Sequence, residues 1–218
     1  MTPRTLELVN WTMEKKCRKV VESLAKRGFK AQFCGTGQEA AAYILEQAKE
    51  AQNVGFGGSL SVADLDLTIA LTEQGKEIIN HGFPNLTPEQ KVIAMRRQLT
   101  CDLFLTGTNA VTLDGVLVNI DGNGNRVASM MFGPKKVIVV VGRNKIVDGS
   151  AEDAIARIKE WASPPNAMRL SKQTPCAVTG ICSDCDSPQR ICRITTILDR
   201  KPTLTDIHVL VVNEDMGL

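Results

Sequence analysis

The sequence predicts an α/β fold built on a mostly parallel sheet with helices on both faces. Segments of strand length alternate with amphipathic segments of helical period along most of the 218 residues. The segment Val137–Val141 is wholly apolar, which is typical of a strand buried on both faces. Apolar residues make up 43% of the chain and charged residues 23%, as in ordinary globular proteins. We therefore expect a single domain over residues 1–218.

Helices and strands alternate in the N-terminal part of the prediction. A long amphipathic helix should end near Gly28, and its apolar positions are Leu6, Val9, Met13, Val20 and Leu24. A strand over 29–33, an Ala-rich helix over 38–50 and a strand over 53–57 are predicted to follow it.

Capping patterns predict the next two helices. Ser61 and Asp64 have the spacing of a capping box, which predicts a helix that continues along one face through Leu65 and Ile69 to Gly75. A cap, a first-turn proline and a third-position amide predict another helix, which runs to about residue 99 and begins with Thr87, Pro88 and Gln90.

The second half adds strands and a segment of different composition. A strand is predicted over 102–106, a hairpin over 111–120 that turns at Asp114-Gly115, a helix over 125–131 and a strand over 136–141. Ser150 and Asp153 should cap a helix through Trp161, and strands are predicted over 194–198 and 207–212. Residues 170–193 hold four of the seven cysteines and show little periodicity, so we expect a Cys-rich, loop-rich insert within the domain.

Charge and hydropathy exclude several classes of function. The formal net charge is +2, with no long basic run, and aromatic residues make up only 4%, so nucleic-acid binding is not expected. No stretch approaches the roughly 18 apolar residues of a membrane-spanning helix, and the start lacks the apolar core of a signal peptide. We therefore expect a cytoplasmic protein. In that reducing compartment, cysteines more often serve as thiols or metal ligands than as disulfides.

A glycine-rich loop after strand 53–57 is the first candidate ligand site. Its glycines would let backbone N–H groups approach an anion at a helix N-terminus, and its hydroxyls would complete a phosphate or carboxylate cradle made of Gly55, Gly57, Gly58, Ser59 and Ser61. Leu60 stands where a dinucleotide fingerprint has its third glycine, so no NAD site is expected. A tight turn with a helix cap would explain the same residues without a ligand.

Two further loops fall where parallel strands end, which is where such folds bind ligands. Gly107, Thr108 and Asn109 follow strand 102–106. The loop over 119–126 is dense in amides, charges and glycines, and its candidate ligand residues are Asn119, Asp121, Gly122, Gly124, Asn125 and Arg126. Arg126 would begin a helix, where its charge opposes the helix dipole, so a bound anion or Asp121 should offset it. Lys145, after the apolar strand, is a further candidate anion contact.

Four cysteines have a spacing compatible with a metal site. In the pattern Cys176-x5-Cys182-x2-Cys185-x6-Cys192, the central pair can place two thiolates on one metal, and the flanking cysteines can supply the other two. We expect an iron–sulfur cluster, with zinc as the alternative. Reduced thiols, or a disulfide formed on oxidation, remain open. The other cysteines, Cys17, Cys34 and Cys101, are predicted to be core residues.

Some catalytic arrangements are missing from the sequence. The only histidines are His81 and His208, and neither has the setting of a base beside a nucleophile; His208 should fill one face of a strand. No Gly-x-Ser-x-Gly motif occurs, which argues against a serine hydrolase. No glutamate occurs between Glu89 and Glu152, the stretch that holds most of the candidate loops.

Several segments together resemble the lactate-utilisation (LUD) domain family in its short stand-alone form. The resemblance lies in Gly55–Ser61, Thr106–Thr112, Asn119–Arg126, Gly133–Lys136 and Asn144–Val147, and the tail Ser187–Cys192 resembles a subset of the family. It implies the Rossmann-like fold of the superfamily of ribose-phosphate isomerase, glucosamine-phosphate deaminase and CoA-transferase. It also implies a role in oxidation of L-lactate or related 2-hydroxy acids, where sister proteins carry iron–sulfur clusters.

Three functions follow from these patterns. The first is an accessory protein of lactate oxidation that binds a small anionic metabolite and works with iron–sulfur proteins. The second is a non-catalytic assembly subunit. The third is an enzyme acting on a phosphorylated metabolite or a CoA ester, with Asp121 as candidate base and Ser59 and Lys145 holding the phosphate. An acyl-glutamyl mechanism is doubtful because of the missing glutamates. A homo-oligomer is compatible with each.

Overall fold

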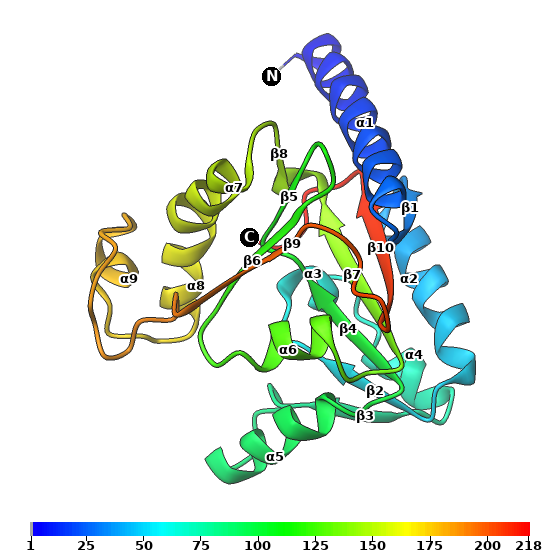
Figure 1. The fold of residues 1–218 in the computed structure, drawn as a ribbon, viewed down its shortest axis with the longest axis vertical. Helices are drawn as coiled ribbons and strands as arrows, with labels where there is room; N and C mark the ends of the chain where they lie inside the picture. The colour runs from blue at the N-terminus through cyan, green and yellow to red at the C-terminus, as the bar shows by residue number, and fades with distance from the viewer. Residues whose placement is uncertain (1) are drawn as a thin grey trace.

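The computed structural model describes residues 2–218 and centres on a parallel sheet. In this part of the chain, six strands pair in the order β1-β10-β7-β4-β2-β3, and every neighbouring pair is parallel (Figure 1). The strands are β1 (Lys30–Cys34), β2 (Asn53–Phe56), β3 (Glu77–Asn80), β4 (Leu103–Gly107), β7 (Lys136–Gly142) and β10 (Asp206–Val212). The predicted α/β class with a mostly parallel sheet is therefore confirmed.

Helices cover both faces of this sheet, and strand β7 shows why. Val137, Val139 and Val141 point into one apolar core, whereas Ile138 and Val140 point into another on the opposite face. Helices α1 (Pro3–Lys26) and α6 (Asn125–Met131) contribute to the first core, and α2 (Gly37–Gln47), α3 (Leu60–Ala63) and α4 (Thr68–Glu73) contribute to the second. A strand buried on both faces needs apolar residues at successive positions, which explains its sequence.

A smaller sheet and a helical arm lie beside the central sheet. Strands β8 (Ile146–Val147), β5 (Ala110–Thr112), β6 (Leu117–Asp121) and β9 (Ile194–Leu198) pair in that order. The predicted hairpin is confirmed as the antiparallel pair β5–β6, which belongs to this second sheet. Helix α7 (Ala151–Arg157) packs against it through a third apolar core and continues as a π-helical turn (Ile158–Ala162) into α8 (Ser163–Arg169); α9 (Pro175–Thr179) follows.

Two predicted helix starts are confirmed by their caps. Thr87 and Ser150 each form a complete capping box, with Gln90 at the start of α5 (Pro88–Gln98) and with Asp153 at the start of α7. The buried thiols of Cys17, Cys34 and Cys101 also lie in the core, as expected.

The helix predicted over 61–75 is wrong in its start and in its continuity. Ser59 caps α3 by accepting a hydrogen bond from the Val62 amide, while the Ser61 hydroxyl donates to the carbonyl of Met216. Asp66 has a left-handed backbone conformation (φ 47°), which separates α3 from α4 and leaves Ile69 65% exposed. Strand β3, which follows these helices, was not predicted from the sequence.

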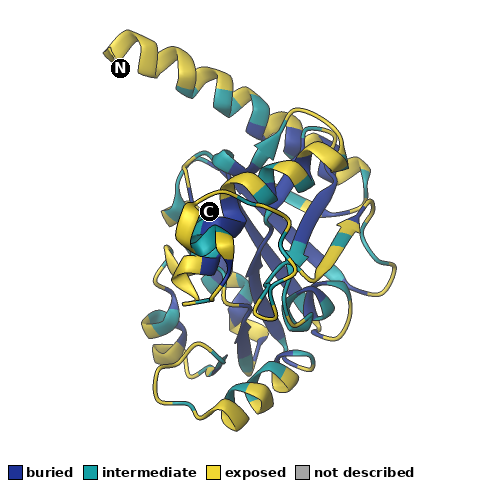
Figure 2. Ribbon diagram, turned by 90° about the vertical axis from the view of Figure 1, so that its left-hand side faces the viewer, coloured by how far each residue is buried: buried dark blue, intermediate teal, exposed yellow. Residues whose placement is uncertain are grey.

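The N-terminal helix extends beyond the body of the molecule. Its buried residues begin at Cys17, and the turns before it are mostly exposed (Figure 2). None of the helices within residues 2–218, this one included, is both long enough and apolar enough to cross a membrane.

Candidate anion-binding cleft and thiol pocket

A cleft of about 780 Å³ opens where several strands of the central sheet end. Gly57–Ser59 follow β2, His81 follows β3, Thr108 and Asn109 follow β4, and Lys145 lies just beyond β7. The carboxyl ends of parallel strands lie at one edge of a sheet, so residues far apart in the sequence meet there. The opposite wall comes from the segments around α8 and around residues 188–193.

The structure brings most of the sequence-predicted ligand residues to this cleft. Those that line it are Gly57, Gly58, Ser59, Gly107, Thr108, Asn109, Asp121, Gly122, Asn125, Arg126 and Lys145. Four other predicted ligand residues are not among those that line it: Gly55, Ser61, Asn119 and Gly124. Gly55 packs against the core, since a Cβ there would lie 2.9 Å from the Cys101 sulfur, and Gly124 begins α6 with a left-handed conformation (φ 85°).

Residues of the glycine-rich loop have structural roles within the protein. The Gly57 amide donates to the Leu105 carbonyl, and the Ser59 hydroxyl caps α3. A Cβ at Gly107 would lie 2.5 Å from the Ser59 hydroxyl oxygen, so close packing explains that glycine. Because α3 has only four residues, its N-terminus contributes little helix dipole to an anion in the predicted cradle.

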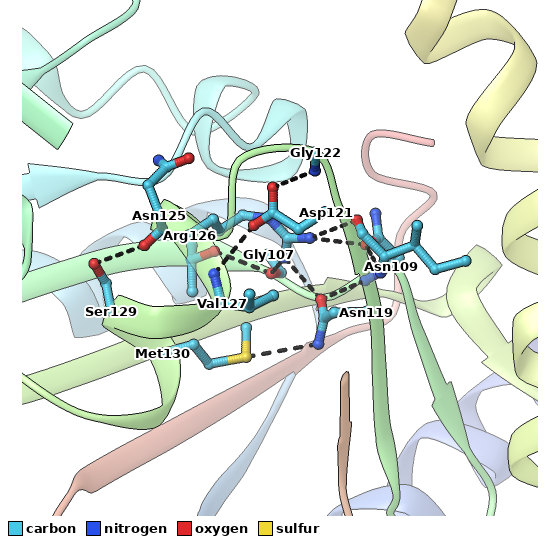
Figure 3. Close-up of polar contacts among 12 residues, drawn as sticks. Gly107, Asn109, Asn119, Asp121, Gly122, Asn125, Arg126, Val127, Ser129 and Met130 are labelled. Carbon is cyan, nitrogen blue, oxygen red and sulfur yellow. Dashed lines mark hydrogen bonds and ion pairs between the residues drawn. The ribbon is translucent and has the colours of Figure 1, made fainter. Parts of the chain in front are cut away.

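Arg126 connects the loops that form one side of the cleft (Figure 3). One terminal nitrogen of its guanidinium donates to the Asn119 side chain (2.7 Å) and the Gly107 carbonyl (3.2 Å). The other donates to the Asn109 side chain (2.9 Å) and the Ile120 carbonyl (3.1 Å). Burial lowers the pKa of Arg126. The sequence suggested an anion contact here, but these partners make Arg126 an organiser of the loops.

Asp121 acts on the same cluster. Its carboxylate accepts hydrogen bonds from the Gly122 amide (2.7 Å) and the Val127 amide (3.2 Å), so it caps the start of α6. It also lies 3.9 Å from the Arg126 guanidinium, and its charge raises the pKa of that group against the effect of burial. The acidic partner expected for Arg126 is thus Asp121. With both oxygens engaged, the carboxylate is placed as a positioning group.

Lys145 is the most unusual charge in the cleft. Its side chain is almost fully buried, and its Nζ donates to the Ser61 hydroxyl at 2.7 Å. No carboxylate of residues 2–218 lies within ion-pair distance of it. Burial lowers the pKa of Lys145 to about 7, the positive charges of Arg157 and Arg126 act in the same direction, and the negative charge of Asp64 acts against them. An anion bound beside this amine would stabilise its charged form and raise its pKa.

His81 is a cleft residue that the sequence analysis did not select. Its Nδ1 lies 3.1 Å from the side-chain nitrogen Nε2 of Gln98, and its Nε2 side faces Gly58. Burial lowers the pKa of His81, which keeps the imidazole neutral at neutral pH. The available signal was its place directly after a strand, but that strand, β3, was itself not predicted.

The charge of the cleft is strongly asymmetric. Among its described lining residues, Asp121 is the one acidic side chain, and the basic ones are Lys91, Arg126, Lys145, Arg169, Lys172, Arg190 and Arg193. A cleft with one sign of charge concentrates ligands of the opposite sign. The cleft is therefore suited to an anion.

The four C-terminal cysteines line one small pocket next to the cleft. Cys176, Cys182, Cys185 and Cys192 all contribute to its wall, and all are free thiols. The Arg190 guanidinium donates to the carbonyls of Cys185 (2.6 Å) and Cys192 (2.7 Å). Within residues 2–218, no three His, Cys, Asp or Glu side chains are grouped closely enough to hold a single metal ion.

This thiol pocket and the cleft have a common wall. Both are lined by Ser163, Arg190, Ile191 and Cys192. The Cys192 sulfur also contacts the Ser163 hydroxyl at 3.3 Å, which fixes it against the arm that carries α8. The two sites are therefore adjacent in the fold.

These observations define an α/β protein with a basic cleft at the carboxyl ends of its parallel strands. The chain belongs to the LUD domain family, whose model matches residues 17–212. A DUF162 family protein from Deinococcus radiodurans is similar in structure, with a TM-score of 0.54 and 15% identity over 92% of this chain and 98% of that one. At this identity the likeness shows the fold alone.

A second solved structure is more distant. The eIF2B beta protein of Chaetomium thermophilum gives a TM-score of 0.32 and 15% identity, over 63% of this chain and 44% of that one. A comparison with curated proteins found no match.

Proposed function

We propose that this LUD-family chain is an accessory protein in the oxidation of L-lactate or a related 2-hydroxy acid, and that its cleft binds a small organic anion. The observation that carries the proposal is the charge asymmetry of the cleft, whose lining has seven basic side chains and one acidic one. Family membership supports the lactate-related role.

The cleft residues would divide the work of binding. Lys145 uses one hydrogen bond on Ser61, so the rest of its amine is available to an anion. Neutral His81 can offer its Nε2 side from the opposite loop. Arg126 and Asp121 hold the loops in place, because their polar atoms are already engaged within the protein.

Thermal unfolding in the presence of anions tests this proposal. A ligand at 100 times its dissociation constant adds about 2.7 kcal/mol to stability, which corresponds to a shift of roughly 5–10 °C for a chain of this size. Lactate, pyruvate or phosphate should produce such a shift, and high salt should reduce it. Lys145→Met should weaken anion binding at least tenfold and so reduce the shift, whereas Lys19→Met, at an exposed site of α1, should leave binding unchanged.

Two results would contradict the proposal. One is a folded wild-type protein that none of these anions stabilises. The other is an anion shift that is identical in wild type and Lys145→Met.

The size of the cleft favours a second candidate ligand class. A cavity of about 780 Å³ is in the range that holds drug-sized ligands and exceeds what a three-carbon acid fills. A phosphorylated metabolite or a CoA ester would use more of the basic wall. Stabilisation by CoA or a sugar phosphate well beyond that by inorganic phosphate would favour this class.

We further propose that the four-cysteine pocket holds an iron–sulfur cluster, with zinc as the alternative. The donor set fits, because all four thiols line one pocket. Lys159 and Arg190 line it with them and share one carboxylate, Asp184, so one positive charge is left to offset part of the thiolate charge. Zinc needs its sulfur ligands about 2.3 Å from one ion, and the thiols are not grouped for a single ion. A cluster contains several metal atoms and accepts more widely spaced sulfurs. When bound, it would supply one-electron transfer.

Metal analysis after anaerobic purification tests the cluster. Wild-type protein should contain iron and acid-labile sulfide and absorb visible light. The double variant Cys182→Ser/Cys185→Ser should lose at least nine-tenths of the iron, because two of four ligands are removed. Cys34→Ala, which removes a buried core thiol outside the pocket, should retain it.

Other outcomes separate the alternatives. Stoichiometric zinc without sulfide would select the zinc site. Metal-free wild-type protein with four titratable thiols in residues 176–192, even after reconstitution, would reject both.

A further inference from the structure

The setting of Lys145 is that of a reactive amine. Several lysines elsewhere in the fold are paired with carboxylates, as Lys30 is with Asp206, Lys135 with Asp102 and Lys159 with Asp184. Lys145 is more buried than any of these, and it has no such partner within the described residues. The negative charge of Asp64 favours the ammonium form of Lys145 but forms no ion pair with it, so burying this amine still destabilises the fold. That cost favours a functional role for Lys145.

The hydrogen bond to Ser61 orients the amine. Ser61 is fully buried, and its hydroxyl donates to the Met216 carbonyl at 3.2 Å. Its proton is therefore committed, and its oxygen accepts from the Lys145 Nζ. A neutral amine held in this way keeps one hydrogen and its lone pair for other contacts. Because Lys145 lines the cleft, those contacts are with whatever the cleft contains.

The surrounding charges favour the nucleophilic form of the amine. Burial disfavours the charged form of the amine most, and the positive charges of Arg157 and Arg126 act in the same direction. The negative charge of Asp64 opposes them without reversing the effect, since the pKa of Lys145 is still lowered to about 7. Arg157 is held by the carbonyls of Asn109 (2.9 Å) and Asn144 (3.0 Å), so its charge is fixed beside the amine. The same cations attract the carboxylate of an incoming acid. A desolvated lysine next to other cations is a recognised way to activate an amine.

We propose that the Lys145 amine forms an imine with the carbonyl carbon of a 2-oxo acid bound in the cleft. This inference rests on the proposed anion-binding function and names its substrate class, since a 2-oxo acid is the oxidised form of a 2-hydroxy acid. The nitrogen lone pair forms the new C–N bond, and the carbonyl oxygen leaves as water with the two amine protons. No oxidant or reductant is consumed in this step.

Reductive trapping tests the imine. Wild-type protein is incubated with pyruvate and sodium cyanoborohydride, and the intact mass is measured. One adduct per chain is expected, with the mass of pyruvate less one oxygen, and peptide mapping should locate it at Lys145. Its rate should rise as the pH is raised through about 7, because the amine loses its proton there. Lactate, which has no carbonyl, should give no adduct.

Matched lysine variants decide the assignment. Lys145→Arg keeps a positive charge but cannot form the imine, so trapping should fall at least tenfold. Lys19→Arg changes an exposed lysine of α1, which does not line the cleft, and should leave trapping at the wild-type level. Circular dichroism and thermal unfolding would establish that both variants are folded.

The results distinguish this inference from the function on which it rests. Pyruvate that stabilises the protein without an adduct overturns the imine and leaves anion binding intact. Equal labelling of several surface lysines, unchanged in Lys145→Arg, also overturns it. If no anion stabilises the protein and no adduct forms, both proposals fail.

Discussion

Replacing Arg126 by methionine is expected to lower the free energy of unfolding by about 3–5 kcal/mol. The substitution leaves the Asp121 carboxylate without its nearby cation and removes the donors that the Asn109 and Asn119 side chains use. Two backbone carbonyls of the cluster also lose a partner. Buried polar groups left unpaired cost much more than exposed ones. Urea denaturation measures the change.

An exposed arginine supplies the matched control. Arg97 forms an ion pair with Glu77 at 2.7 Å, and both side chains are about half exposed. Arg97→Met should therefore cost only about 0–1 kcal/mol. Equal losses in the two variants would show that the Arg126 contacts do not hold the loops together.

Gly133→Ala is expected to destabilise the protein by about 2–5 kcal/mol. Gly133 lies between α6 and β7 and has a φ of 129°, which L-residues with a Cβ rarely adopt. An added Cβ would also overlap the carbonyl oxygen of Leu99 at the end of α5. The Leu99 carbonyl belongs to the backbone, and the position of a Cβ is fixed by the backbone of residue 133, so no side-chain rotation relieves the overlap. Chemical denaturation gives the magnitude.

Gly75→Ala separates the steric overlap from the backbone strain. Gly75 also has a positive φ (75°), but a Cβ there would meet nothing within 4 Å. Its substitution should cost about 1–2 kcal/mol from the backbone alone. If Gly133→Ala were no more harmful than Gly75→Ala, the close approach of Gly133 to Leu99 would be disproved.

Local patterns predicted the elements whose partners are close in the sequence or whose burial is uniform. The apolar run of β7 and the capping boxes at Thr87 and Ser150 are signals of this kind. The prediction that Ser61 caps a helix was wrong because its hydroxyl forms hydrogen bonds with Lys145 and Met216, which lie 84 and 155 positions away. A capping pattern contains no information about such distant partners.

The position of the cleft was predictable, but the role of each side chain was not. Strand order brings Ser59, Asn109 and Arg126 to one edge of the sheet, as the general rule for parallel sheets requires. The inward orientation of the Arg126 guanidinium depends on the side chains of Asn109, in the turn after β4, and Asn119, in β6. The burial of Lys145 and His81 likewise depends on how distant segments pack, which no local pattern encodes.

The strand order also has a consequence for how this chain is made. Strand β10 lies between β1 and β7, so the first strand of the central sheet has no neighbour until residues 206–212 leave the ribosome. Until then, both edges of β1 and one edge of β7 are unpaired. Pairing across so long a sequence separation is also intrinsically slow. Because unpaired strand edges favour aggregation, we expect the nascent chain to be most prone to aggregate before β10 has been made.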